Sequence, residues 1–431
     1  MRQYETYKDT GIKWIGKVPS HWELSKLKHN FHIYAGATPK TGEKANWDGD
    51  ICWITPADYK TKDKYVSRGQ RNISQIGYNS CNTQIVPKGS LIVSKRAPIG
   101  TVAISSNPLC TNQGCLSCVP LNANVTYYYY CASIATEIFD LFGSGTTFKE
   151  ISANAFANIK FPCPPLKEQN EIATYLDTYT NKIDIIIKAR EKKIQLLEEL
   201  KTSIITMAVI KGVKKDVETK DSGIAWIGTI PAHWESSIFK RFLREPMKYG
   251  ANESAESDNR DYPRYIRITD IDSEGNLKDE TFKSLPMNKA QDYLLEKGDV
   301  LFARSGATVG KTYIHKGDTL ACYAGYLIKA KCNNKLLPEY LFLYTQTGAY
   351  ENWKNSIFIQ STIQNIGADK YSYMPIVVPP INEQEEIVSF VKKRIEIIND
   401  NITKAYREIE LIKEYRSSLI TEVVTGKRKI I

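Results

Sequence analysis

The sequence predicts a mixed α/β protein in which two similar globular domains are joined by two long antiparallel helices. Two observations support this prediction. Two long stretches of helical periodicity, 168–211 and from Ile381 onward, contain no glycine or proline until Gly212 and Gly426. The segments before each stretch also resemble each other, so the chain has an internal pseudo-two-fold repeat of globule and helix.

The first long helix is expected over residues 166–212. Prolines between Pro162 and Pro165 end the extended segment before it. Its apolar residues then recur with a period near 3.6, at Ile172, Leu176, Ile183, Ile187, Ile194, Leu197, Leu200, Ile204 and Ala208. At about 1.5 Å per residue such a helix could reach roughly 65 Å. A helix of this length needs a second helix to cover its apolar stripe.

The second long helix, expected within 381–431 together with a C-terminal tail, supplies that partner. Its stripe comprises Ile387, Val391, Ile395, Ile398, Ile402, Ala405, Ile409, Ile412, Tyr415, Leu419 and Val423. Together the two stripes favour an antiparallel coiled coil that acts as a spacer. Thr180 and Arg190 interrupt the first stripe where Ile395 and Ala405 stand in the second. We expect a contact with another subunit at these two positions.

The segments before the helices predict two globular domains, residues 1–165 and 213–380. Residues 9–23 recur at 221–235 as Asp-x-Gly-Ile-x-Trp-Ile-Gly-x-Ile/Val-Pro-x-His-Trp-Glu. Other matched features are Asp58 with Asp270, apolar strands at 91–93 and 300–302, and helical segments at 126–142 and 338–353. The inserts around 40–47 and 247–263 share nothing. The frame therefore repeats while the inserts differ.

Composition limits the possible classes of protein. A chain of 431 residues is too long for one ordinary core, and its formal charge of +10 permits a polyanionic partner without requiring one. The nine cysteines, an odd number mostly in apolar strand-like runs, indicate reduced core residues and not a disulfide framework. The first residues are polar, and no apolar run is long enough to span a bilayer. We expect a cytoplasmic protein with no membrane partner.

Several segments approach chemical motifs but depart from them. Residues 306–312 have one residue too few between the glycines for a phosphate-binding loop, and the repeat partner has no lysine. Cys115 and Cys118 lack a second ligand pair, which favours core cysteines over a zinc site. Packing or capping suffices for His21 and His233, and core packing explains most of the tyrosine run 127–130. We expect no catalytic centre, cofactor or metal in this chain.

The loops after the two repeated strands are the candidate binding sites. Lys95, Arg96 and Arg304 directly follow apolar strands, where a long cation can reach a phosphate or a guanine edge. A second pair of matched segments adds hydroxyls, an ammonium and an amide. The candidate DNA-contacting residues are Lys95, Arg96, Thr146, Thr147, Lys149, Arg304, Ser305, Ser361, Thr362 and Gln364. An alternative, solvated turns without a ligand, stays open, although the equivalent positions in both halves count against it.

The sequence resembles the specificity (S) subunit of type I restriction-modification enzymes. The resemblance rests on the blocks at 9–23 and 221–235, the two Pro-Pro-Ile/Leu-x-Glu-Gln blocks, and the two helices that end near Ile-Thr, and it covers essentially the whole chain. It implies a non-catalytic, sequence-specific DNA-recognition subunit. Each globular domain would be a target-recognition domain for one half of a bipartite target, and the helices would space the two domains.

The resemblance also implies the partners. They are double-stranded DNA, two methyltransferase (modification) subunits docked on the helices, and restriction (helicase-nuclease) subunits. S-adenosylmethionine, ATP and Mg are expected in those partner subunits. An alternative function is a coiled-coil protein-protein scaffold without DNA specificity, which would show no salt-dependent DNA binding. A self-sufficient nucleotide-dependent enzyme is disfavoured by the defective phosphate-binding loop.

Overall fold

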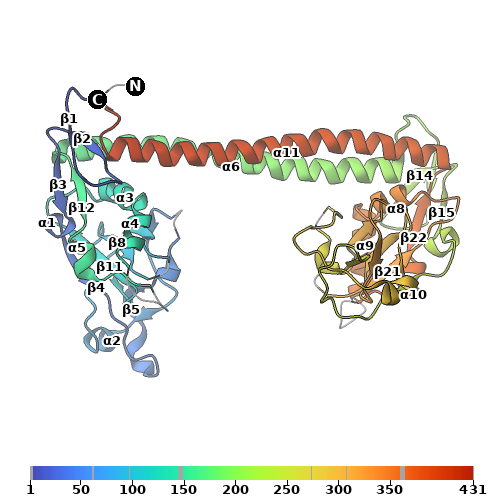
Figure 1. The fold of residues 1–431 in the computed structure, drawn as a ribbon, viewed down its shortest axis with the longest axis horizontal. Coiled ribbons are helices and arrows are strands. Elements are labelled where there is room, and N and C mark those ends of the chain that lie inside the picture. Colours follow the sequence, from blue (N-terminus) through green and yellow to red (C-terminus); the bar gives the residue numbers. More distant parts are fainter. Residues whose placement is uncertain are drawn as a thin grey trace. The chain divides into compact units, whose positions relative to one another are not determined.

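The computed structural model describes residues 3–60, 63–96, 98–143, 149–272, 274–306, 308–359 and 365–430. The chain forms two compact units. Unit 1 comprises Met1–Arg190 together with Arg407–Ile431, and unit 2 comprises Glu191–Tyr406. Both boundaries fall inside the two long helices, α6 (Leu166–Lys211) and α11 (Ile381–Val424), so each unit contains part of both helices (Figure 1).

Small sheets form the framework of unit 1. Its strands are β1 (Tyr7–Asp9), β2 (Lys17–Pro19), β3 (Glu23–Lys26), β4 (Phe31–Ala35), β5 (Trp47–Ile54), β6 (Tyr65–Val66), β7 (Asn72–Ile73), β8 (Leu91–Ser94), β9 (Val102–Ser105), β10 (Cys110–Thr111), β11 (Cys115–Pro120) and β12 (Lys160–Cys163). The largest sheet has the order β4-β11-β8-β9-β6, beside β10-β5-β7, β12-β3 and β1-β2. The pairs β5–β10 and β6–β9 are parallel, and the others are antiparallel.

Unit 2 repeats this topology. Its strands are β13 (Thr219–Asp221), β14 (Thr229–Pro231), β15 (Glu235–Ile238), β16 (Lys248–Tyr249), β17 (Arg264–Ile266), β18 (Val300–Ala303), β19 (Thr312–Ile314), β20 (Ala321–Tyr323), β21 (Leu327–Ala330) and β22 (Pro375–Val378). The order β16-β21-β18-β19 corresponds to β4-β11-β8-β9, and the parallel pair β17–β20 corresponds to β5–β10. The internal repeat of the sequence is therefore also a structural repeat.

Short helices complete both units. They are α1 (Leu27–Asn30), α2 (Gln75–Asn79), α3 (Val125–Ser133), α4 (Thr136–Leu141), α5 (Ala153–Ala157), α7 (Met287–Ala290), α8 (Pro338–Tyr344), α9 (Gly348–Ile359) and α10 (Ala368–Ser372). Single turns of 3-10 helix cover η1 (Lys44–Asn46), η2 (Pro56–Asp58), η3 (Phe239–Phe242), η4 (Ile268–Asp270) and η5 (Gln291–Tyr293). Across the described ranges, none of the helices combines the length and apolarity that a membrane crossing requires.

The helical segments expected at 126–142 and 338–353 are each two helices, so these predictions were wrong in their continuity. Hydroxyl groups stand at both breaks. Ser133 donates to the Tyr130 carbonyl at 2.8 Å, and Thr347 donates to the Tyr344 carbonyl at 2.7 Å. A side-chain hydroxyl that bonds the preceding turn competes with the backbone ladder, and this accounts for the early helix ends.

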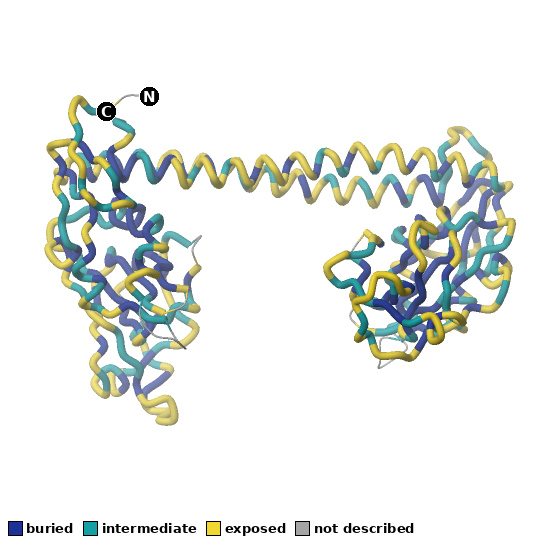
Figure 2. Tube along the Cα trace, viewed as in Figure 1, coloured by how far each residue is buried: buried dark blue, intermediate teal, exposed yellow. Residues whose placement is uncertain are grey.

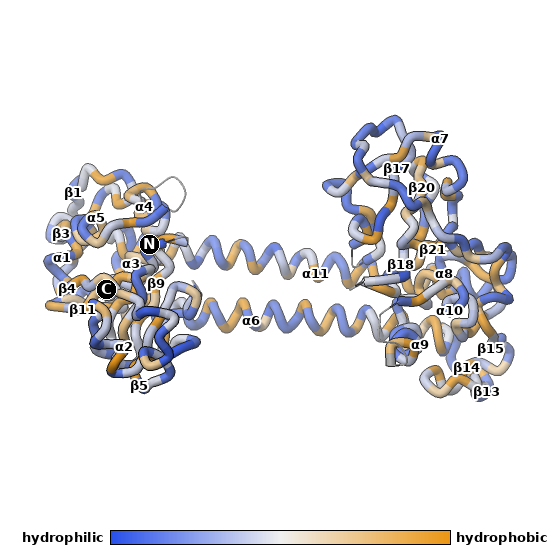
Figure 3. The backbone as a smooth tube through the Cα atoms, turned by 90° about the horizontal axis from the view of Figure 1, so that it is seen from below, coloured by the Kyte–Doolittle hydropathy of each residue, from blue (hydrophilic) through white to orange (hydrophobic). Residues whose placement is uncertain are grey.

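The long helices contribute apolar residues to the core of each unit. Ile172 and Leu176 of α6 join Leu419 and Val423 of α11 in the main core of unit 1. Ile205 and Val209 join Ile387 and Val391 in the main core of unit 2. Buried and exposed residues alternate along both helices (Figure 2), as do apolar and polar residues (Figure 3). The predicted apolar stripes are confirmed at Ile172, Leu176, Ile387, Val391, Leu419 and Val423. Near the end of α6 the core residues Ile205 and Val209 lie one position after the predicted Ile204 and Ala208.

Two ion pairs show that the helices run antiparallel within unit 1. Asp184 pairs with Arg416 at 3.2 Å, and further along α6 Arg190 pairs with the earlier Glu408 at 2.6 Å. Thr180 is only 3% exposed, and its hydroxyl lies 2.9 Å from the Tyr130 hydroxyl. The expected contact with another subunit was wrong at Thr180, because this side chain is buried within its own unit. At Arg190, whose side chain is 40% exposed, the expected contact stays a prediction.

Within each unit, the repeated block that contains the His-Trp pair contacts the repeated block that begins a long helix. The indole nitrogen of the block tryptophan and the imidazole Nε2 of the block histidine both reach one glutamate carboxylate. The sets are Trp22, His21 and Glu168 at 2.8 and 2.7 Å in unit 1, and Trp234, His233 and Glu383 at 3.0 and 2.9 Å in unit 2. Each histidine thus contacts a glutamate in the first turn of a long helix, as expected for the packing or capping role.

The end of the other long helix is held in the same unit by a buried tyrosine. The Tyr127 hydroxyl lies 3.1 Å from the Val424 carbonyl at the end of α11. The Tyr340 hydroxyl lies 2.8 Å from the Val209 carbonyl near the end of α6. All four residues of the run 127–130 are buried, so core packing is confirmed for them. Each unit thus fixes the start of one long helix and the end of the other.

Candidate nucleic-acid interface

Backbone hydrogen bonds hold the loop after β8 on both sides. The Lys95 N–H donates to the Gly114 carbonyl at 2.8 Å, and the Ile151 N–H donates to the Lys95 carbonyl at 3.0 Å. Arg96 forms an isolated antiparallel bridge with Glu150. Gly100, with φ of 87°, adopts a left-handed conformation that suits glycine and turns the chain toward β9. Positions 95 and 96 are therefore fixed relative to position 150.

The loop after β18 in unit 2 has the same framework. The Arg304 N–H donates to the Tyr326 carbonyl at 3.0 Å, and the Ile366 N–H donates to the Arg304 carbonyl at 2.8 Å. Ser305 forms the bridge with Asn365, and Gly310 has φ of 85°. By these bonds Lys95 corresponds to Arg304, Arg96 to Ser305, and Glu150 to Asn365.

One carboxylate neutralises part of the positive charge in the unit 1 loop. Glu150 accepts from Lys95 Nζ through Oε1 at 2.7 Å and from Arg96 Nε through Oε2 at 2.7 Å. The Lys95 side chain is 13% exposed and that of Arg96 is 48% exposed. Burial opposes ionisation of Glu150, but the hydrogen bonds from Lys95 and Arg96 outweigh it and hold its pKa below the ordinary value.

In unit 2 an aromatic ring takes the place of the carboxylate. The Arg304 guanidinium carbon lies 5.0 Å from the centre of the Tyr249 ring, a cation–π contact. The Tyr249 hydroxyl in turn accepts from the Ala368 N–H at 3.0 Å, at the start of α10. Arg304 Nε is buried without a hydrogen-bond partner among the described residues. The equivalent of Glu150 is the neutral Asn365.

The remaining candidate residues divide into two groups. Lys149 Nζ pairs with Asp140 on the surface of unit 1, and both side chains are more than one-third exposed. Thr146, Thr147, Ser361, Thr362 and Gln364 lie outside the described residues. Among the described candidates, Lys95, Arg96 and Lys149 therefore lie in one region of unit 1, and Arg304 and Ser305 lie in the equivalent region of unit 2.

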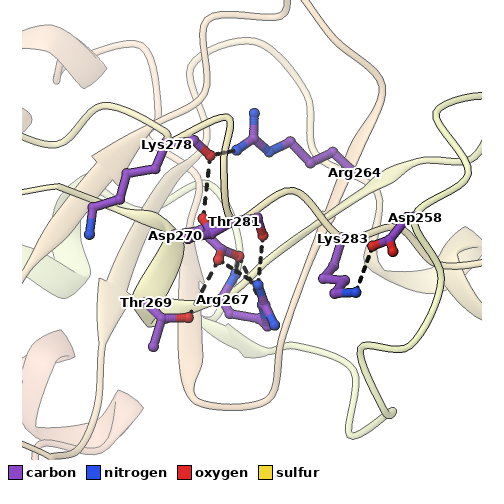
Figure 4. A network of polar contacts seen from close by, with 8 residues as sticks. All are labelled: Asp258, Arg264, Arg267, Thr269, Asp270, Lys278, Thr281 and Lys283. Atoms are coloured by element: carbon purple, nitrogen blue, oxygen red, sulfur yellow. Dashed lines mark hydrogen bonds and ion pairs between the residues drawn. The ribbon is translucent and has the colours of Figure 1, made fainter. Parts of the chain in front are cut away.

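Other arginines of unit 2 are engaged inside the unit. Asp270 is 1% exposed and accepts from Arg267 Nη2 at 2.7 Å and Nε at 3.0 Å (Figure 4). Arg264 donates through Nη2 to the Lys278 carbonyl (Figure 4). In unit 1 the matched Asp58 accepts from the backbone N–H of Thr55 at 2.7 Å. The matched aspartates thus stabilise equivalent short helices, and in unit 2 Arg267 holds the aspartate in place.

Sequence reasoning missed Glu150 and Tyr249, which set the environment of the candidate cations. Glu150 lies in the matched segment 146–151 next to Lys149, so its proximity to a basic loop offered a weak signal. Tyr249 offered none. It stands opposite Ile328 of β21, where unit 1 has Ala35 opposite Leu116 of β11. This equivalence emerges only from strand pairing.

The two rejected motifs have ordinary structural roles. The lysine of the first motif, Lys311, directly precedes β19, a strand antiparallel to β18, whereas a phosphate-binding loop leads into a helix. Lys311 Nζ donates to the Ile271 carbonyl at 2.8 Å. Cys115 and Cys118 are buried in different apolar clusters of unit 1. The core interpretation of these two cysteines is confirmed.

Comparison with known families gives a match to most of the chain. Residues 19–196 and 247–411 match the family model described as the type I restriction modification DNA specificity domain. The type I restriction enzyme MjaIX specificity subunit of Methanocaldococcus jannaschii is 26% identical, with 99% of this chain and 98% of the relative covered. The EcoKI specificity subunit of Escherichia coli K12 is 23% identical, with 88% and 83% covered.

Solved structures show the same fold. A chain from a structure of the type I R-M system has a TM-score of 0.72 at 13% identity, covering 94% of this chain and 98% of that one. The HsdS subunit from Thermoanaerobacter tengcongensis has a TM-score of 0.52 at 14% identity, covering 95% and 98%. The repeated arrangement of sheets and long helices is thus shared with these proteins.

Proposed function

Since this chain belongs to the family of type I restriction-modification DNA specificity domains, we propose that it is the sequence-specific DNA-recognition subunit of a type I restriction-modification complex. The globular parts, residues 1–165 and 213–380, are its two target-recognition domains, and each reads one half of a bipartite target. The chain itself is non-catalytic. Methyltransferase and restriction subunits supply S-adenosylmethionine, ATP and Mg chemistry to the complex.

One observation carries this proposal: the same loop framework occurs twice with different side chains. The bonds around Lys95 and Arg304 are equivalent, whereas the neighbouring side chains differ in chemistry. Glu150 corresponds to the neutral Asn365, and Tyr249 corresponds to Ala35. Two readers of different DNA sequences need a common backbone frame and separate side-chain surfaces. Arg96 and Arg304 supply guanidinium groups, which suit guanine edges and phosphates. Lys149 and Ser305 add a cation and a hydroxyl for the backbone of DNA.

The long helices support the proposed partner subunits. Large apolar side chains are exposed on both helices, although Leu200 and Tyr415 were expected within the covered stripes. These exposed residues are Leu166, Tyr179, Ile185, Ile186, Leu196, Leu200 and Met207 on α6, and Phe390, Ile397, Tyr406, Leu411 and Tyr415 on α11. Apolar residues left uncovered on long helices suit docking of another protein. Two methyltransferase subunits, one for each half-site, fit the repeated architecture.

Methylation-site mapping in cells that carry the chain with its methyltransferase subunits tests the proposal. We expect methylated adenines within one bipartite sequence, with two fixed half-sites and a constant gap. Binding of the purified chain to duplex DNA should weaken steeply with salt, because phosphate contacts release counterions. Salt-independent weak binding and the absence of any common methylated sequence would favour the scaffold alternative.

A further inference from the structure

Arg96 is anchored at one end of its guanidinium group. Its Nε lies 2.7 Å from Glu150 Oε2, and the backbones of the two residues form a bridge. In the described part of the chain, its terminal Nη atoms have no hydrogen-bond partner. The side chain is nevertheless 48% exposed. The terminal edge of the guanidinium, which carries the paired donors for a bidentate contact, is therefore not engaged by any residue that the structure describes.

Glu150 is itself held in place from a second side. Its other oxygen, Oε1, lies 2.7 Å from Lys95 Nζ, and the Lys95 side chain is only 13% exposed. A carboxylate fixed by a largely buried ammonium cannot follow an arginine that swings outward. The position of the Arg96 guanidinium is therefore set by Glu150, and Lys95 completes the support.

Arg304 obtains the same kind of support from Tyr249. The cation–π contact with the ring holds the guanidinium beside Tyr249. The hydrogen bond from the Ala368 N–H fixes the far end of the tyrosine. Because Nε is buried, only the terminal edge of the group is available to a ligand. The two units thus orient an arginine by different means.

We propose that Glu150 and Tyr249 are positioning residues for base recognition, each presenting the terminal edge of an arginine, Arg96 or Arg304, to one guanine of its half-site. This inference rests on the proposed function. The matching acceptors are guanine O6 and N7, which accept two parallel hydrogen bonds from a guanidinium in the major groove. Each half-site then contains a guanine whose recognition depends on a residue that does not touch DNA.

The negative charge of Glu150 lets an experiment distinguish a positioning role from a role in folding. Glu150 adds negative charge beside the DNA, so it weakens binding to every sequence while it orients Arg96. A residue needed only for folding would instead support binding to all sequences. Replacing Glu150 should therefore strengthen binding to non-target DNA and weaken discrimination at one base pair.

The test is selection from a random duplex library by the full-length chain and its variants, followed by titration of the selected duplexes. For Glu150→Gln we expect about tenfold weaker preference for guanine at one position of the first half-site, with tighter non-target binding. Tyr249→Ala should have the same effect on one position of the second half-site, without tighter non-target binding. Tyr249→Phe keeps the ring and should retain the preference. Arg96→Lys keeps the positive charge and should lose the preference for guanine.

A modified base provides an independent measurement. Replacing the identified guanine by 7-deazaguanine should weaken binding of the wild-type chain and leave binding of Glu150→Gln unchanged. Unaltered preferences in Glu150→Gln and Tyr249→Ala would overturn the inference while leaving the proposed function intact. Loss of preference over both half-sites together with weaker non-target binding would assign these residues to folding and also overturn it. Selection of no sequence by the wild-type chain would overturn the proposed function as well.

Discussion

The loops after β8 and β18 share a backbone framework but use different neighbours for their cations. Unit 1 places the carboxylate of Glu150 between Lys95 and Arg96, whereas unit 2 places Arg304 on the ring of Tyr249. The net charge of these groups is the same, since two cations and one carboxylate match one cation. The difference lies in how the guanidinium is oriented. Backbone bonds locate the reading group, and a neighbouring side chain decides its direction.

The largest expected effect comes from changing the helices while leaving both loops intact. Inserting four residues after Glu198 in α6 and four after Asp400 in α11 should lengthen the helices by about 6 Å. We expect methylation of the original sites to be lost and the gap between half-sites to grow by up to about two base pairs, since DNA rises about 3.4 Å per base pair. The half-site sequences should stay the same.

Methylation-site mapping of the insertion variant with its partner subunits gives the result. An active variant that keeps the original gap would show that the helices do not set the spacing. A variant with changed half-site sequences would show that the loops and helices are not independent.

The next largest effect is a loss of stability that should be confined to one of the two units. Trp22→Ala and Trp234→Ala each remove a fully buried indole and its bond to the glutamate that begins a long helix. Each should lower the free energy of unfolding by about 3–5 kcal/mol. Native-state hydrogen exchange should show the loss in the unit that carries the change. His21→Ala is the control, since this half-exposed partner of the same carboxylate should cost less than about 1 kcal/mol. Equal loss of protection in both units would contradict independent units.

A smaller effect is expected from Arg304→Ala. If this arginine contacts a base, binding to the target should weaken by about 1–3 kcal/mol and one position of the second half-site should become relaxed. Lys149→Ala is the matched control, because an exposed lysine suits phosphate and its loss should weaken all sequences alike with a shallower salt dependence. Titrations at several salt concentrations distinguish the two. No change on Arg304→Ala would assign this loop to a solvated turn.

The smallest effect follows from the carboxylate that only unit 1 has. Because the folded-state pKa of Glu150 is lowered, its stabilising contribution is complete above the unfolded value of about 4.3 and is lost as pH falls through the folded-state pKa. The difference in unfolding free energy between wild type and Glu150→Gln should be below about 1 kcal/mol at pH 7 and should vanish on acidification. Asn365→Ala should show no such trend. Denaturant titrations between pH 7 and pH 3 measure both.

The long helices and the doubled frame could be predicted because their signals are local. A 3.6-residue period without glycine or proline predicts a helix wherever it occurs, and α6 and α11 follow it closely. Thr180 misled the prediction because its partner, Tyr130, comes from a different helix. The split of the helical segment at Ser133 depended on a single hydroxyl bond. Such contacts leave no periodic trace in the sequence.

The candidate site was predictable only in part for the same reason. Arg304 could be found from its place after an apolar strand and its match in the other half. Its neighbour Tyr249 lies far away along the chain in a segment whose sequence shows no match to the other half, and only the pairing of β16 with β21 brings it to the cation. Glu150 likewise reaches Arg96 through a bridge between distant segments.

The division of the chain also bears on the order in which its parts can fold during synthesis. Unit 2 is one continuous segment, Glu191–Tyr406, whereas unit 1 needs Arg407–Ile431 to supply Leu419 and Val423 to its core. A ribosome therefore releases every residue of unit 2 before the last residues of unit 1. The N-terminal part of the chain must wait, with part of its apolar core uncovered, until Leu419 and Val423 have been made. The domain made first is completed last.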